Sequence, residues 1–270
     1  MIRAIVTGAA GRMGSQLIRA VRDAEGIELV GATERAGTAA IGLDAGLAAG
    51  LGMLEVTVQD TLERAIEKAG GKVDVVIDFT TAEASLAHAV VAARHKVALV
   101  VGSTGFSSEA REAVVAAGND IPMVMAPNMS IGVNLLLKIA AEVAEGLGAD
   151  YEVEILEMHH RHKIDAPSGT AVRLAEVIAE KLERRPERDI AYVRRGVIGE
   201  RPRSQIGVQS LRGGDVVGEH TVYFIGEGER IELTHRAWSR DQFAAGAVRA
   251  ARWIVGKPAG LYSMRDVLDS

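Results

Sequence analysis

The 270-residue sequence contains no cysteine, which excludes disulfide bonds and thiol chemistry and is compatible with a reducing compartment. It also lacks an excess of basic residues: the net charge is -5 and the charges are interspersed, so we expect no nucleic-acid partner. No apolar run approaches the roughly 20 residues that a membrane span needs. Glycines interrupt the apolar start at residue 8, too early for a signal peptide. We therefore expect a cytoplasmic protein without a membrane partner.

What the sequence does contain is typical of a packed α/β protein. Hydrophobic residues make up 48% of the chain and glycine occurs 30 times, which is enough for one large domain or two modest ones. In the first half, short apolar runs alternate with segments of helical periodicity. We predict strands at 2–7, 27–33, 73–79, 97–101 and 122–125, and helices at 82–94 and 107–117. Strands that are almost continuously apolar favour a parallel sheet covered on both faces.

A glycine-rich turn, Gly8–Gly14, lies between the first strand and a segment whose apolar residues recur at helical spacing. The unpaired amides at the start of such a helix bind a pyrophosphate, and Glu34, twenty residues beyond Gly14, can accept hydrogen bonds from a ribose. Arg35 could instead pair with a 2′-phosphate, so NADH and NADPH both remain open. The alternative is a glycine-rich turn that binds no ligand.

Three further strand ends carry small, polar or turn-forming residues, namely 79–81, 102–105 and 126–130. In a parallel sheet these ends share one edge, which is where ligands bind in open α/β folds. As a set, they outline a cofactor cleft in a Rossmann-like nucleotide domain. Residues 36–52 form a connection rich in glycine and alanine that no pattern places.

The second half of the chain has a different pattern. We predict a long amphipathic helix at 128–146, with Leu135, Ile139, Val143 and Leu147 on one stripe, and a last helix at 241–255. Between them lie strand-like segments at 151–156, 206–211, 220–225 and 230–235, and a helix at 169–183. The pattern predicts a second α+β domain, with a mostly antiparallel sheet and helices on one side.

The segment 157–170 places three of the seven histidines and a lysine on the connection between a strand and a helix. Imidazoles and an amine beside the anion-binding start of a helix supply proton donors for an acidic substrate. Two other interpretations stay open. The segment could be a solvated basic loop. It could bind a metal, although the chain has no cysteine and Glu157 and Asp165 do not complete a recognised spacing.

Several motifs together resemble those of the 4-hydroxy-tetrahydrodipicolinate reductase family, also called dihydrodipicolinate reductases. They are GAAGRMG at 8–14, GSTGF at 102–106, APNMS at 126–130 and, above all, HHRHKIDAPSGT at 159–170. GEHT at 218–221 and MRDVL at 264–268 are also similar, so the resemblance covers nearly the whole chain. Two departures are mild: Ser103 stands where threonine is frequent, and Met129 stands where phenylalanine is frequent.

The resemblance implies roles for individual residues. The acid/base histidine falls on His159 and the proton-donating lysine on Lys163, while contacts to a substrate carboxylate fall on His160, Gly169 and Thr170. Contacts to the cofactor fall on Gly8, Ala9, Ala10, Gly11, Arg12, Met13, Glu34, Arg35, Gly102, Ser103, Thr104, Ala126, Pro127, Asn128 and Met129. No metal is implied.

The implied reaction transfers a hydride from NADH or NADPH to C4 of a cyclic imine dicarboxylate, formed as the 4-hydroxyl leaves as water. A proton must then be delivered to the resulting enamine. The resemblance places this reaction in lysine and diaminopimelate biosynthesis. The resemblance also implies a nucleotide domain at 1–127 completed by 241–270, and a domain at 128–240 that binds substrate and builds a homotetramer. Two rivals share the architecture: another nicotinamide dehydrogenase, such as an aspartate dehydrogenase, and a dinucleotide-sensing regulator. Neither requires the histidine-to-threonine loop.

Overall fold

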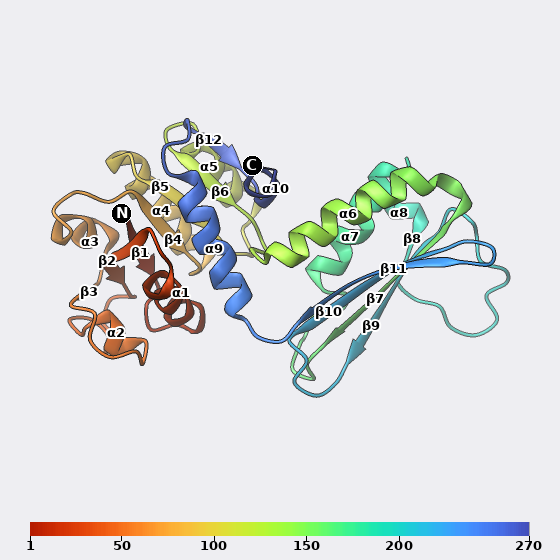
Figure 1. The fold of residues 1–270 in the computed structure, drawn as a ribbon, viewed down its shortest axis with the longest axis horizontal. Coiled ribbons are helices and arrows are strands. Elements are labelled where there is room, and N and C mark those ends of the chain that lie inside the picture. Colours follow the sequence, from red (N-terminus) through yellow and green to blue (C-terminus); the bar gives the residue numbers. More distant parts are fainter. Residues whose placement is uncertain (270) are drawn as a thin grey trace. The chain divides into compact units, whose positions relative to one another are not determined.

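The computed structural model describes residues 1–269, which form two compact units. The first comprises Met1–Ile131 and the chain from Asp241 onward, and the second comprises Gly132–Arg240 (Figure 1). The first unit is built on a parallel sheet and the second on a separate sheet with helices beside it. The predicted fold class, a Rossmann-like nucleotide fold plus a second α+β unit, is confirmed.

The sheet of the first unit has seven strands in the order β12-β6-β5-β4-β1-β2-β3, and every neighbouring pair is parallel. Strands β2 and β3 extend the sheet on one side of β1, and β4, β5, β6 and β12 extend it on the other, so the order reverses between β1 and β4. The carboxyl ends of all seven strands lie on one edge. The strands are β1 (Ile2–Thr7), β2 (Ile27–Thr33), β3 (Val58–Gln59), β4 (Val75–Asp78), β5 (Ala98–Val101), β6 (Pro122–Met125) and β12 (Gly260–Tyr262).

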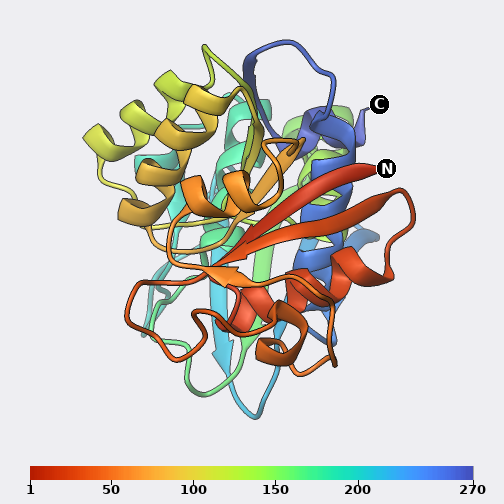
Figure 2. The ribbon, with the colours of Figure 1, turned by 90° about the vertical axis from the view of Figure 1, so that its left-hand side faces the viewer.

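Helices cover both faces of this sheet (Figure 2). Ala4 and Val6 point into the core shared with α1 (Arg12–Asp23), α9 (Asp241–Ile254) and α10 (Met264–Leu268). Ile5 points the other way, into the core shared with α3 (Leu62–Lys68), α4 (Ala82–His95) and α5 (Ser108–Ala117). Because side chains alternate across a strand, burial on both faces explains the continuous apolar runs.

The second unit has a five-stranded sheet in the order β11-β10-β7-β9-β8. Its pairing is mixed: β10 is antiparallel to β7 and β11, whereas β9 is parallel to β7 and β8. One face packs against α6 and α7, around Val153, Ile155 and Phe224 (Figure 1). Its elements are α6 (Ile131–Leu147), the 3-10 helix η1 (Gly148–Asp150), β7 (Glu152–His159), α7 (Gly169–Lys181), α8 (Pro186–Asp189), β8 (Ile190–Ala191), β9 (Ile206–Arg212), β10 (Gly218–Ile225) and β11 (Arg230–Ala237).

Some sequence-based details need correction. The helix expected from residue 128 begins at Ile131, because Asn128 Oδ1 accepts the backbone N–H of Ser130 and forms a turn there. Its fully buried stripe is Val133, Leu136, Ala140 and Ala144. Of the predicted stripe, Val143 and Leu147 pack against this core, whereas Leu135 is exposed. The unplaced connection contains the short helix α2 (Ala45–Ala48), whose N-cap Asp44 accepts the backbone N–H of Gly46 in the helix and that of Leu54 beyond it.

Candidate functional site

The turn after β1 is shaped by its glycines. Gly8 has a φ of +69°, which favours glycine, and a Cβ on Gly14 would lie 1.8 Å from the carbonyl oxygen of Gly8. Helix α1 can therefore start directly against the turn. Its N-cap, Gly11, offers no side chain to the amides of the first turn. A helix start of this kind binds an anion such as a pyrophosphate.

Glu34 ties this turn to the end of β2. Its Oε2 accepts the backbone N–H of Ala10 at 2.9 Å, and its Oε1 accepts that of Arg35 at 2.9 Å. Each carboxylate oxygen has a second acceptor position, so Glu34 can still accept from a hydroxyl. Arg35 is exposed beside it. The predicted nucleotide residues at the ends of β1 and β2 are thus brought together.

The ends of β4, β5 and β6 add the remaining predicted cofactor residues to the same edge. A Cβ on Gly102 would lie 2.2 Å from the ring of Phe79, so the two strand ends touch. Ser103 is buried and its Oγ accepts from Ser85 Oγ at 2.7 Å. The turn through Pro127 and Asn128 follows β6. Met129 is 1% exposed and packs in the core.

The second unit carries the histidine segment on the end of β7. Glu157 is fully buried there, and its carboxylate is held by several hydrogen bonds. Oε2 lies 2.6 Å from Nδ1 of His159, the guanidinium of Arg212 donates to both oxygens at 2.8 Å, and Oε1 accepts the backbone N–H of Ser168 at 3.0 Å. Burial by itself raises the pKa of Glu157, but these hydrogen bonds outweigh it and hold the pKa well below its usual range.

An ionised Glu157 fixes the tautomer of His159. A carboxylate can only accept, so Nδ1 of His159 donates to it and Nε2 is the atom left to take or give a proton. Gly218, at the start of β10, lies beside Nε2, and a Cβ on this glycine would be 3.0 Å from that atom. The imidazole is therefore oriented on one side by a charge and accommodated on the other by a glycine.

Ser168 begins α7. Its Oγ accepts the backbone N–H of Ala171 at 3.2 Å and lies 3.0 Å from Nε2 of His220. His220 is 4% exposed, and burial lowers its pKa to about 3, so it is neutral at physiological pH. Gly169 and Thr170 follow as the first two residues of α7. The backbone of Ser168 is thereby held by Glu157 and its side chain by the helix it caps.

The middle of the histidine segment is more open than its ends. Lys163 Nζ pairs with Asp165 at 2.8 Å, and the lysine side chain is 20% exposed. Ile164 is fully exposed, whereas His159 and Ser168 are buried. Burial and the charge of Arg240 lower the pKa of His160. The basic-loop interpretation thus describes the middle of the segment, while its ends belong to a hydrogen-bonded network.

Four members of this network were not predicted: Glu157 as an orienting group, Ser168 as more than a cap, Arg212 and His220. One signal was present in the sequence. Alternation along β7 puts Glu157 on the face of Val153 and Ile155, so it had to be a buried carboxylate. A buried carboxylate requires a cation or several donors. The sequence pattern does not single out Arg212 among the arginines, because Arg212 lies 55 residues from Glu157 in the chain.

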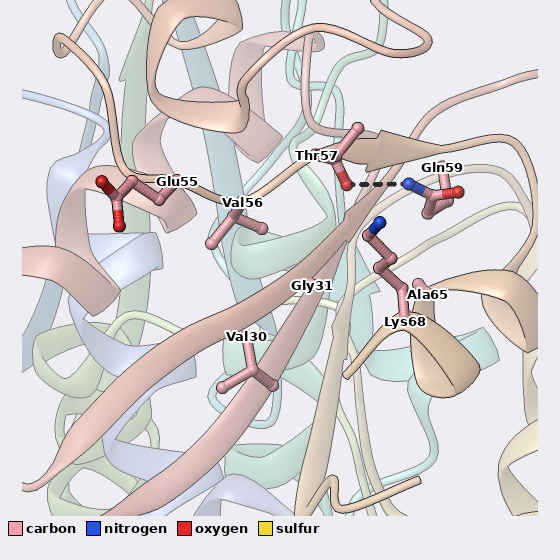
Figure 3. Close-up of a pocket in the computed structure, with 8 residues that line it drawn as sticks. All are labelled: Val30, Gly31, Glu55, Val56, Thr57, Gln59, Ala65 and Lys68. Atoms are coloured by element: carbon pink, nitrogen blue, oxygen red, sulfur yellow. Dashed lines mark hydrogen bonds between the residues drawn. The ribbon is translucent and has the colours of Figure 1, made fainter. Parts of the chain in front are cut away.

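No other feature of the described residues combines the predicted functional residues as the carboxyl edge of the first sheet and the histidine segment do. A hollow of about 120 Å³ lies beside β2 and α3, lined by Val30, Gly31, Glu55, Val56, Thr57, Gln59, Ala65 and Lys68 (Figure 3). It contains none of the predicted site residues. Within residues 1–269, no group of three or more His, Asp or Glu side chains is arranged to hold a metal ion. In the same range, no helix is both long and apolar enough to cross a membrane.

Comparison with known proteins agrees with this arrangement. The family model for the dihydrodipicolinate reductase N-terminus matches residues 2–129, and that for its C-terminus matches residues 132–268. A 4-hydroxy-tetrahydrodipicolinate reductase from Myxococcus xanthus is 60% identical over 268 residues, which cover 99% of this chain and 98% of that protein.

Solved structures are similar as well. The dipicolinate-bound dihydrodipicolinate reductase from Paenisporosarcina sp. TG-14 superposes with a TM-score of 0.77 at 28% identity, covering 97% of each chain. An amine dehydrogenase from Mycobacterium smegmatis has a TM-score of 0.62 at 14% identity, covering 97% of this chain and 95% of that one. The second likeness shows the shared fold alone.

Proposed function

The chain belongs to the dihydrodipicolinate reductase family, and from that premise we propose that it reduces 4-hydroxy-tetrahydrodipicolinate to tetrahydrodipicolinate with loss of water. The reductant is NADH or NADPH, and the step serves lysine and diaminopimelate biosynthesis. One observation carries the proposal beyond family membership: the Glu157–His159 pair and the start of α7 share Ser168. A proton donor and an anion site are therefore built from one network.

The cofactor half of the site lies on the carboxyl edge of the first unit. The start of α1, with Gly8–Met13, would hold the pyrophosphate, and Glu34 and Arg35 would meet the adenosine ribose or its 2′-phosphate. Gly102–Thr104 and Ala126–Met129 would border the nicotinamide. When bound, the reduced nicotinamide supplies the hydride. The protein residues position it, and both forms of the cofactor are accepted.

The substrate half lies on the second unit. A dicarboxylate substrate needs donors for its negative oxygens, and these come from the first amides of α7 at Gly169 and Thr170, and from His160. His159 and Lys163 deliver the proton to the enamine formed after hydride transfer. Glu157 accepts from Nδ1 of His159, which leaves Nε2 as the atom that would exchange the proton with the substrate. Lys163, paired with exposed Asp165, can exchange that partner for a substrate carboxylate.

The two units also divide the larger tasks. We assign nucleotide binding to 1–127 with 241–270, and substrate binding and assembly to 128–240. In the second unit, Leu211 on β9 and Ile225 on β10 are exposed on the sheet face away from α6 and α7. Apolar side chains on an open sheet face suit a protein interface, and we propose a homotetramer formed through this unit. The cytoplasm, which holds the cofactor pool, is the compartment we propose.

A coupled assay tests the activity. The substrate is generated enzymatically in the cuvette, the purified protein is added, and the loss of reduced nicotinamide absorbance is followed together with the product by mass spectrometry. The proposal predicts oxidation of NADH and of NADPH that depends on the substrate. The product should have gained two hydrogens and lost one water relative to the substrate. Turnover only with the substrates of an amino-acid dehydrogenase would instead support the rival dehydrogenase. Cofactor binding without turnover would support the regulator.

A further inference from the structure

Asp78, at the end of β4, is a fully buried carboxylate that the proposed reaction does not use. Its Oδ1 accepts the backbone N–H of Thr80 at 2.9 Å and the hydroxyl of Thr80 at 2.6 Å. Its Oδ2 lies 2.7 Å from Nδ1 of His88, which extends from α4. One carboxylate thus joins the end of a central strand, the loop that follows it and the next helix.

The protonation of this group follows from its partners. Burial by itself raises the pKa of Asp78, but the hydrogen bonds from His88 and Thr80 outweigh it and lower the pKa below its usual value. The carboxylate is ionised, so Nδ1 of His88 donates to it. The charge of Asp78 is buried and its side chain is held by Thr80 and His88, so removing either hydrogen-bond partner should be costly.

The loop held by Asp78 touches both glycine loops of the cofactor edge. The methyl group of Thr80 would lie 3.0 Å from a Cβ on Gly8, and the ring of Phe79 would lie 2.2 Å from a Cβ on Gly102. Helix α4 reaches the second loop again through Ser85, whose Oγ donates to Ser103 Oγ at 2.7 Å. The segment from Asp78 to His88 therefore contacts both the Gly8 loop and the Gly102 loop, at the point where the strand order reverses.

We propose that Asp78 and His88 are positioning residues for the dinucleotide, holding the 79–81 loop so that the loops of Gly8 and Gly102 keep the spacing that the cofactor requires. The inference rests on the proposed cofactor half of the site. Its physical basis is that binding loops must be fixed to within a fraction of an ångström by their supporting contacts. Neither Asp78 nor His88 is assigned a contact with the cofactor itself.

Three variants separate positioning from general stability. His88→Ala removes the donor, and His88→Asn retains an N–H close to the place of Nδ1. Asp74→Asn is the matched control, because Asp74 precedes the same strand at its other end and accepts the backbone N–H of Arg3 at 2.7 Å. The Kd for NADH is measured by isothermal titration calorimetry on the full-length protein. Thermal unfolding and circular dichroism are recorded for each variant.

The expected result is a Kd for NADH raised roughly tenfold or more in His88→Ala, within about threefold of wild type in His88→Asn, and unchanged in Asp74→Asn. A His88→Ala Kd within about twofold of wild type would overturn the inference. An equal loss of affinity in Asp74→Asn would also overturn it, because the effect would then come from general destabilisation. A wild-type protein that binds neither NADH nor NADPH would refute the proposed function itself.

Discussion

Nδ1 of His159 lies 2.6 Å from Oε2 of Glu157, two residues earlier on β7 and on the same buried face of the strand. The same carboxylate is held by Arg212 and by the backbone of Ser168. The orientation of the imidazole therefore depends on a charge that the strand itself carries. It also depends on the contact that fixes the start of α7.

Replacing Glu157 by glutamine tests this dependence. Glu157→Gln keeps the size of the side chain but removes the charge that makes Nδ1 a donor, so a fraction of His159 should adopt the wrong tautomer. We expect kcat to fall roughly 10- to 100-fold, with the Kd for NADH unchanged. Glu176→Gln, on the exposed side of α7, is the control and should retain full activity. Equal kcat values for wild type and Glu157→Gln would refute the orienting role.

The buried His220 predicts a loss of stability in acid. Burial lowers its folded-state pKa to about 3, well below the ordinary value of about 6.5 for histidine, so the unfolded chain takes up a proton before the folded protein does. The resulting stability is complete above about pH 6.5 and is lost as the pH falls toward 3, at up to about 1.4 kcal/mol per pH unit. His220→Gln retains a polar partner for Ser168 but does not titrate. Urea unfolding between pH 7.5 and 4.5 should give a flatter pH dependence for this variant, and parallel curves would contradict the assignment.

Thr170→Ala should raise the KM for the dicarboxylate substrate more than it lowers kcat. In the proposed site, the start of α7 binds a substrate carboxylate that is present in the ground state and in the transition state alike, so loss of this contact weakens both equally. Steady-state kinetics at saturating cofactor measure the split. An unchanged KM would mean that Ser168–Thr170 serve only to cap the helix.

Cofactor choice follows from Glu34 and Arg35. In the proposed cofactor site, Glu34 would favour a free ribose, whereas exposed Arg35 would attract a 2′-phosphate through a pairing that solvent and salt screen to about 1 kcal/mol. We expect kcat/KM values for NADH and NADPH within about tenfold of each other, and a selective loss with NADPH in Arg35→Ala. A wild-type preference above about a hundredfold, well beyond what a screened pair can supply, would show that the ribose pocket is built differently.

The sequence predicted the parts of the fold that have a strong local pattern. The apolar strands, the glycine turn and the boundaries of β2 and β6 could be recognised because buried parallel strands are apolar throughout. The short β12 and α10 have too few residues to show a period. The mixed pairing of the second sheet was also out of reach, since β7 and β9 pair in parallel across about fifty residues of intervening chain.

The site was predicted unevenly for a similar reason. Residues that follow one another, such as His159 to Thr170, could be recognised as a group together with their helix start. Arg212 on β9 supports Glu157 and His220 on β10 supports Ser168, and only the folded sheet brings these residues together. The roles of His159, Lys163 and the cofactor residues remain predictions that kinetics must test.

The central claim is that the histidine segment performs the proton chemistry on the substrate while the cofactor binds elsewhere. The most direct test measures kcat and the Kd for NADH in His159→Gln and in Lys163→Ala. The account predicts that turnover falls by about two orders of magnitude or more in each variant, with the Kd for NADH within about twofold of wild type. Turnover near the wild-type value, or a loss of NADH affinity that matches the loss of turnover, would contradict it.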